Sequence, residues 1–165
     1  MFKYPITLLV LLMTQFSVIA QDTTLQRTKY IITKSIHDGE DLTSFDVDRG
    51  GEFIFEFKNK VLVNFINNSS IDTTYSFGPV LNFKLDSLTK KNDFEKQTWT
   101  RFKWYFKNSY DSVTGYANID FIVKETNFET RFYLKMSIPK LKSITEYWGY
   151  QEGKKNEYII DETIF

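Results

Sequence analysis

His37 is the residue whose type most directly suggests acid–base chemistry, because it is the one histidine among 165 residues. It stands beside Asp38 and Gly39 in a predicted turn. A Ser-His-Asp site needs an imidazole that a carboxylate orients toward a serine, and no serine of this chain lies in a nucleophile-elbow sequence. We therefore interpret His37 as an exposed turn residue and predict no catalytic residue.

Metal binding is the second chemistry that residue spacing could indicate. The chain has no Cys and a single His, which excludes a zinc site built from these two residue types. Asp46 and Asp48 have the i, i+2 spacing of calcium loops, but the third acidic ligand and the closing Glu of an EF-hand are missing. P-loop and dinucleotide-binding motifs are absent too. The sequence therefore predicts no metal and no cofactor, and a solvated loop at 46–50.

Paired carboxylates could still cleave polysaccharide, because the chain has 21 acidic residues. A glycosidase needs two carboxyl groups roughly 5–10 Å apart across a cleft. Sequence spacing cannot locate such a pair, and a β domain of this length leaves little room for a walled cleft. A small secreted hydrolase or lyase acting on polysaccharide is the alternative to a non-enzymatic protein.

Aromatic residues form 18% of the chain, and several fall on faces that we predict to be exposed. Exposed Tyr and Trp side chains can anchor a sugar, a peptide or a partner protein. They also favour strands and cover their cross-strand neighbours, which is a purely structural role. The candidate binding residues on this outer face are Trp99, Tyr105, Tyr116 and Tyr133, with Tyr105 and Tyr116 as neighbours across a hairpin.

Trp104 is the candidate on the opposite, inner face. It alternates with Phe102 and Phe106 along one predicted strand. In a wide barrel these side chains would line a ligand cavity, and in a narrow one they would form a filled core. If a ligand is held inside, we expect Trp104 to be essential for its binding.

The elements that position these residues are three consecutive strands with clean period-2 alternation, which gives one buried and one exposed face. They are Thr98–Phe106, Gly115–Glu125 and Glu129–Ile138, joined by turns. If Phe102 lies opposite Ile119 inside, Arg101 must lie opposite Asp120 outside. A slip by one residue would turn the inner set outward, so the register should be well specified.

The rest of the chain reads as further short strands and hairpins. Pro79 cannot donate to a β-ladder, so we expect a bend or a sheet edge at Gly78–Pro79. A loop is expected at 42–51, with Leu42, Phe45 and Val47 packed across one end of the domain, and a second loop at 87–96. The remaining strands are predicted at Lys29–Ile36, at Glu52–Ile66 as a hairpin that turns at 58–60, at Thr73–Phe77, at Val80–Leu85 and at Ile144–Tyr150.

This series of local hairpins predicts an all-β fold, an antiparallel, meander-rich barrel of eight to ten strands. A two-sheet β-sandwich is the alternative. The layout of an exported chain, serial hairpins and an aromatic interior resembles small exported lipocalin-like barrels. The Gly-x-Trp sequence found near the first strand of lipocalins has no counterpart in 29–36, and no residue role follows from the resemblance.

The first 20 residues are predicted to be a secretory signal peptide. Lys3 gives a short positive region, 6–13 is apolar, and 17–20 ends in small residues that suggest cleavage after Ala20. Residues 21–165 then form a single domain, exported to the periplasm or the medium and without a further membrane span. The whole chain has 21 basic and 21 acidic residues, so charge does not suggest nucleic acid as a partner.

These features together predict an exported, non-enzymatic β-domain that binds a small apolar ligand inside or a partner protein on its aromatic face. A structural, envelope-associated protein without a ligand is a further alternative. An apolar cavity of several hundred Å³ would favour the ligand-binding role.

Overall fold

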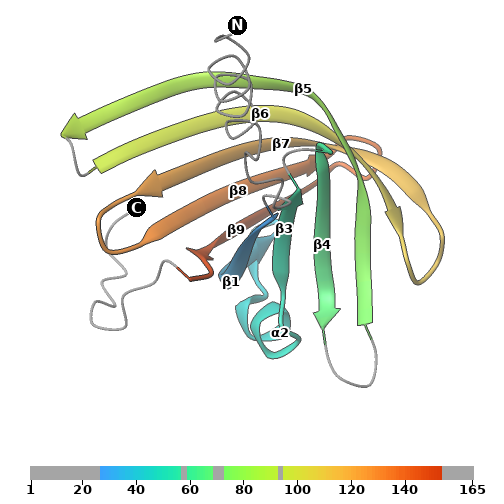
Figure 1. Cartoon of the computed structure of the whole chain (residues 1–165). Helices are drawn as coiled ribbons and strands as arrows, with labels where there is room; N and C mark the ends of the chain where they lie inside the picture. The colour runs from blue at the N-terminus through green and yellow to red at the C-terminus, as the bar shows by residue number, and fades with distance from the viewer. Residues whose placement is uncertain (1–26, 57–58, 69–72, 93–94, 154–165) are drawn as a thin grey trace, which may run out of the picture.

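The computed structural model describes residues 27–56, 59–68, 73–92 and 95–153, and they form a closed β-barrel (Figure 1). In chain order its strands are β1 (Arg27–His37), β2 (Glu40–Asp41), β3 (Glu52–Glu56), β4 (Val61–Asn68), β5 (Thr73–Asn92), β6 (Glu95–Asn108), β7 (Thr114–Glu125), β8 (Thr130–Ile138) and β9 (Ser143–Gln151). Strands β3 to β9 pair antiparallel in sequence order, and β1 pairs with both β3 and β9. This double pairing closes a ring of eight strands, with β2 added at the end of β1. The barrel prediction is confirmed and the sandwich is excluded.

The register of the middle strands agrees with the sequence pattern. Phe102 lies opposite Ile119, and Arg101 lies opposite Asp120. The Arg101 Nε and the Asp120 Oδ1 are 3.8 Å apart on the outer surface. Phe102 and Ile119 are both buried, because the inner face of this sheet is the barrel interior. Alternation alone therefore assigned the two faces correctly.

Strand β5 differs from the prediction, because it runs through both the expected break and the expected loop. Pro79 lies opposite Val61, the first residue of β4, and past Val80 the strand pairs with β6 alone. Figure 1 shows β5 and β6 running on together beyond β3 and β4. The sheet edge expected at Pro79 is thus present, but the strand continues. Pairing with a long β6 outweighs the polar composition of 87–92, which by itself favours a loop.

The loop expected at 42–51 contains a short helix, α2 (Thr43–Asp48). Phe45 and Val47 are 44% and 42% exposed, whereas Asp46 is buried. The prediction that the apolar side chains of this segment pack across the barrel end is only partly correct, because Phe45 lines a cavity at that end and Leu42 is partly buried, whereas Val47 is exposed. The buried side chain of this segment is the acidic Asp46, which pairs with the partly exposed His37, as described below.

Aromatic rings fill one half of the barrel interior. The ring centroid of Phe121 lies 5.2 Å from that of Tyr30 and 5.0 Å from that of Phe55. Phe132, which is completely buried, lies 5.3 Å from Tyr30. Such edge-on and offset contacts are the favoured geometries of aromatic pairs. This half, the filled half, is a packed core.

Residues 1–26, including the predicted signal peptide, lie outside the described residues, as do residues 154–165. In the part of the chain that the structure describes, no helix has the length and apolar character needed to cross a membrane.

Candidate functional site: a cavity at one end of the barrel

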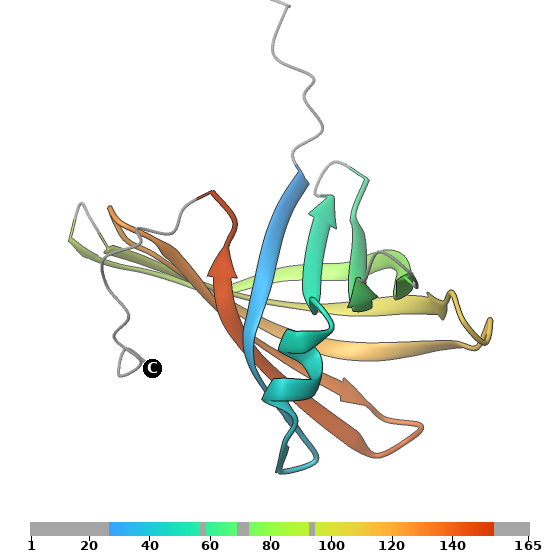
Figure 2. The ribbon, with the colours of Figure 1, turned by 90° about the horizontal axis from the view of Figure 1, so that it is seen from below.

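The other half of the interior holds a cavity of about 430 Å³. It opens at the end of the barrel where β1, β4, β6 and β8 finish, and α2 lies beside β1 at this end (Figure 2). Its walls are formed largely by apolar and aromatic side chains, namely Ile32, Phe65, Trp104, Phe106, Met136 and Ile138. Polar side chains also line it, among them His37, Asp46, Asn64, Asn108, Asp111 and Tyr147. Apolar walls with a few convergent polar groups are typical of small-molecule sites.

The His37–Asp46 pair is the main charged feature of the cavity. The Nε2 of His37 lies 2.8 Å from the Oδ2 of Asp46, and the Asp46 side chain is only 7% exposed. His37 ends β1 and Asp46 lies on α2, so the pair depends on how the helix is docked. The interpretation of His37 as an exposed turn residue is wrong, because this contact leaves it only partly exposed.

Backbone and side-chain hydrogen bonds fix α2 against β1. Thr43 Oγ1 accepts a hydrogen bond from the Ser35 N–H (3.1 Å), and the Leu42 N–H donates to the Ser35 carbonyl (3.2 Å). The Gly51 N–H donates to the Asp46 carbonyl (2.8 Å). A Cβ on Gly51 would lie 2.9 Å from that carbonyl oxygen, so only glycine permits this close approach.

Tyr147 lies behind the charged pair. Its ring centroid is 5.7 Å from that of His37 in an edge-on contact, and its hydroxyl hydrogen-bonds with Asn64 and Thr145. Burial, followed by the nearby Asp46 carboxylate, raises the pKa of Tyr147 well above its usual value. The phenol is therefore a neutral hydrogen-bonding group at physiological pH.

A second polar chain lies across the cavity on β5 and β6. The Ser76 hydroxyl donates to Asn108 Oδ1 (2.7 Å), and the Asn108 amide donates to the Tyr110 hydroxyl (3.0 Å). Ser76 and Asn108 are buried, yet each has its partner. Satisfied buried polar groups of this kind give a rigid wall.

Trp104 is the predicted inner residue that lines the cavity. It is 1% exposed, and its ring lies 5.2 Å from that of Phe106. Its Nε1–H has no hydrogen-bond partner among the described residues. Buried N–H groups without an acceptor are rare in native proteins, so this donor requires an explanation.

On the outer surface, Tyr105 and Tyr116 lie directly opposite each other, as predicted. Their ring centroids are 6.0 Å apart, and they are 42% and 37% exposed. The Lys103 ammonium lies 4.7 Å from the centre of the Tyr116 ring. The two tyrosines form an exposed pair with a cation beside it.

Trp99 and Tyr133 lie elsewhere on the outer surface, both opposite Ile122 of β7. Tyr133 packs against Trp148, with ring centroids 5.2 Å apart, and its hydroxyl donates to Glu146. Trp99 and Tyr105 are six positions apart on β6, which is roughly 20 Å along a strand. The structure therefore does not bring the four outer candidates together, and a binding role for either group stays a prediction.

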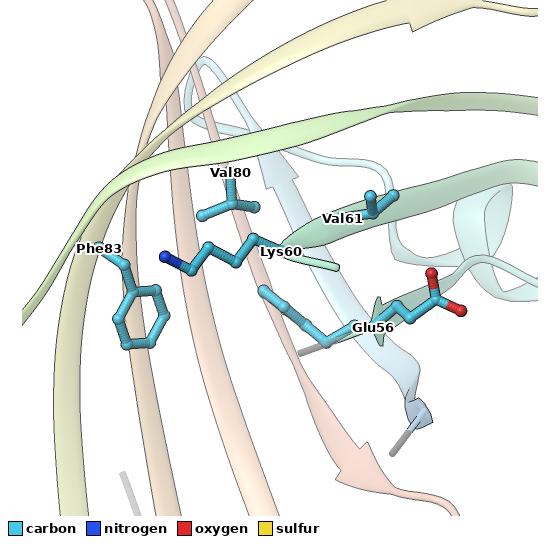
Figure 3. Close-up of a pocket in the computed structure, with 6 residues that line it drawn as sticks. Glu56, Lys60, Val61, Val80 and Phe83 are labelled. Atoms are coloured by element: carbon cyan, nitrogen blue, oxygen red, sulfur yellow. The ribbon is translucent and has the colours of Figure 1, made fainter. Parts of the chain in front are cut away.

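A smaller cavity of about 210 Å³ lies at the opposite end of the barrel (Figure 3). Its walls include Phe55, Val61, Val80 and Phe83, and the Lys60 side chain extends toward the ring of Phe83. Phe83 is 49% exposed and Val61 is partly exposed, so this hollow is shallow. Its charged lining residues are Glu56 and Lys60.

The described residues contain no group of three or more His, Cys, Asp or Glu side chains that could hold a metal ion. Sequence reasoning missed Asn64, Asp46 and Tyr147 as cavity residues. Asn64 carried a signal, since it follows the apolar Leu62 at the next inward position of β4. The sequence around Asp46 gave no such signal, because its partner His37 lies on another element.

Comparison of the chain with protein-family models, with curated proteins and with solved structures returned no match. The fold and the site therefore define the class of protein by themselves. It is a closed, antiparallel, eight-stranded β-barrel with one filled half and one hollow half.

Proposed function

We propose that this protein is an exported, non-enzymatic barrel that binds a small, largely apolar molecule in the cavity beside α2. The observation that carries the proposal is the cavity of about 430 Å³ inside the barrel, walled by apolar side chains. Ligand sites of small-molecule binding proteins have volumes of about 300–1,000 Å³ and similar linings. We include two further points in this proposal. The protein is similar to lipocalin-like barrels, and residues 1–20 direct its export.

The lack of a nucleophile beside His37 supports binding rather than catalysis. Within the described residues, the hydrogen bond of the His37 ring goes to Asp46, and no Ser or Thr hydroxyl bonds to it. An imidazole oriented by a carboxylate activates a nucleophile only when that nucleophile is within hydrogen-bond reach. We therefore assign the pair to the shape and polarity of the cavity mouth.

The outer aromatic residues are a weaker basis for a binding site. Tyr105 and Tyr116 form one exposed pair, with Lys103 beside it. Contiguous apolar patches mark interaction surfaces better than separate aromatic pairs do. The cavity is accordingly the site that we propose.

Titration of the exported form with the uncharged dye N-phenyl-1-naphthylamine tests this proposal, since the dye becomes fluorescent in apolar sites. Met136 lies on β8 and lines the cavity, whereas its neighbour Lys135 faces outward. We expect Met136→Trp to fill the cavity and weaken dye binding at least tenfold. Lys135→Trp, the matched control, should bind like the wild type, and Trp104→Ala should lose binding. A wild-type protein that binds no dye, or equal binding by both Trp variants, would refute the proposal.

A further inference from the structure

The charged side chains along the cavity are mainly acidic. Among the described lining residues, Asp46 and Asp111 are acidic, His37 is the one basic group, and none is Lys or Arg. With a neutral imidazole the two carboxylates leave two negative charges, and with a protonated imidazole they leave one. The cavity therefore has no net positive charge in either state of His37.

Burial strengthens the electrostatic effect of one of these carboxylates, that of Asp46. The Asp46 side chain is 7% exposed, so water screens its charge much less than that of a surface carboxylate. Asp111 lies in the turn after β6, where its Oδ1 accepts a hydrogen bond from the Val113 N–H (2.8 Å). A carboxylate ligand entering this mouth would pass both groups without meeting a lysine or an arginine in the lining.

The unpaired Nε1–H of Trp104 adds a second, independent requirement. The side chain is 1% exposed and lines the cavity, and its donor lacks an acceptor among the described residues. Nε1 itself is covered by the surrounding protein, so a ligand oxygen in the cavity supplies that acceptor when the indole shifts toward it. A site with a buried donor favours ligands that complete the hydrogen bond over those that leave it unmade.

We propose that the cavity takes a small amphiphilic molecule that has no negative charge and that offers an oxygen acceptor to Trp104 Nε1, and that it rejects carboxylates of the same size. This inference rests on the proposed function, because it requires a ligand in the cavity. It names the ligand class by two features, charge and acceptor, and each can be tested separately.

Displacement of N-phenyl-1-naphthylamine by octanamide and by octanoate tests the charge, because the two molecules are nearly equal in size and both carry a carbonyl oxygen. We expect octanamide to displace the dye at a concentration at least tenfold lower. In Asp46→Asn/Asp111→Asn that ratio should fall by roughly tenfold, as expected for removal of two nearby charges. Asp120→Asn on the outer surface removes the same charge elsewhere and should leave the ratio unchanged. Equal or better displacement by octanoate in the wild type overturns the inference, while dye binding itself keeps the proposed function intact.

The indole N–H resonances in an NMR spectrum test whether the ligand accepts a hydrogen bond from Trp104. The chain has three tryptophans, so three indole signals are expected. Octanamide should move the Trp104 signal downfield and leave the Trp99 and Trp148 signals in place. Trp104→Phe assigns the signal directly, and if this variant does not fold, Trp99→Phe and Trp148→Phe assign it by elimination. Displacement of the dye by octanamide with an unmoved Trp104 signal would show that the acceptor part is wrong.

Discussion

The two halves of the barrel interior show the same inward alternation along their strands, yet one is filled and the other is hollow. In the filled half, the inward positions of β1, β3, β7 and β8 carry Tyr30, Phe55, Phe121 and Phe132, whose rings are in contact. In the hollow half, the inward positions of β5, β6 and β9 include Ser76, Asn108 and Thr145. These small polar side chains lie beside large wall residues such as Trp104 and Phe106 and cannot span the interior, so space remains.

The difference shows that side-chain size at inward positions decides between core and cavity in a barrel of fixed strand number. A cavity that can hold a ligand therefore lowers the stability of the fold, since a void loses the contacts that a ring would make. Substitutions that change size in one half should therefore have different consequences in the other half.

The largest effect is expected from emptying the filled half. Phe121→Ala removes a ring that is 4% exposed and contacts three other rings, so it should lower the free energy of unfolding by about 3–5 kcal/mol. Its neighbour Asp120 faces outward, and Asp120→Ala should cost less than about 1 kcal/mol. Urea unfolding of both variants measures the difference. Equal or reversed costs would contradict the assignment of the two faces.

Enlarging a side chain should distinguish the halves in the opposite sense. Leu134 is completely buried in the filled half, so Leu134→Trp should cost about 1–3 kcal/mol through overpacking. Met136 is the next inward residue of β8 and lines the cavity, so Met136→Trp should cost less than about 1 kcal/mol. Urea unfolding again gives both values. If Met136→Trp were the more costly change, the hollow half would not hold the space described.

Alkaline pH probes one buried tyrosine in each half. Burial raises the pKa of Tyr30 and of Tyr147 above the usual value of 10.0. The unfolded chain therefore loses these protons first, so the stability present below pH 10 is lost as the pH rises toward the folded-state values. Each group should contribute a slope of about 1.4 kcal/mol per pH unit in that range.

Denaturant midpoints of Tyr30→Phe and Tyr147→Phe, measured from pH 8 to 11, give these slopes. In each variant the free energy of unfolding should fall less steeply above pH 10, because one of the two buried phenols is missing. At pH 8, Tyr147→Phe should also cost about 1 kcal/mol, because its hydroxyl bonds with Asn64 and Thr145. An unchanged alkaline slope in both variants would mean that neither phenol is buried in solution.

The smallest effect is expected on the outer surface. Tyr105→Ala/Tyr116→Ala removes an exposed cross-strand pair, so it should cost about 1 kcal/mol or less. Dye binding in the cavity should not change, because both rings lie on the other face of the sheet. If a pull-down with the wild type captures a partner that this double variant fails to capture, the outer pair is a binding site of its own.

The amino-acid sequence by itself determined the all-β class and the facing and register of the middle strands. Phe102 opposite Ile119 and Arg101 opposite Asp120 follow from period-2 alternation, which is a local property of a strand. The pairing of Tyr105 with Tyr116 follows from the same register. Trp104 was likewise identifiable as an inward residue, although the sequence left open whether it lines a cavity or belongs to a filled core.

Only the tertiary structure decided the features that depend on residues distant in the chain. Closure requires β1 to pair with β9, and the interior volume depends on which inward side chains of eight strands face one another. The burial of Asp46 depends on His37 at the end of another element, and the polar run at 87–92 is a strand because β6 pairs with it. Local patterns carry no record of these partners, because the contacts form only when the chain closes on itself.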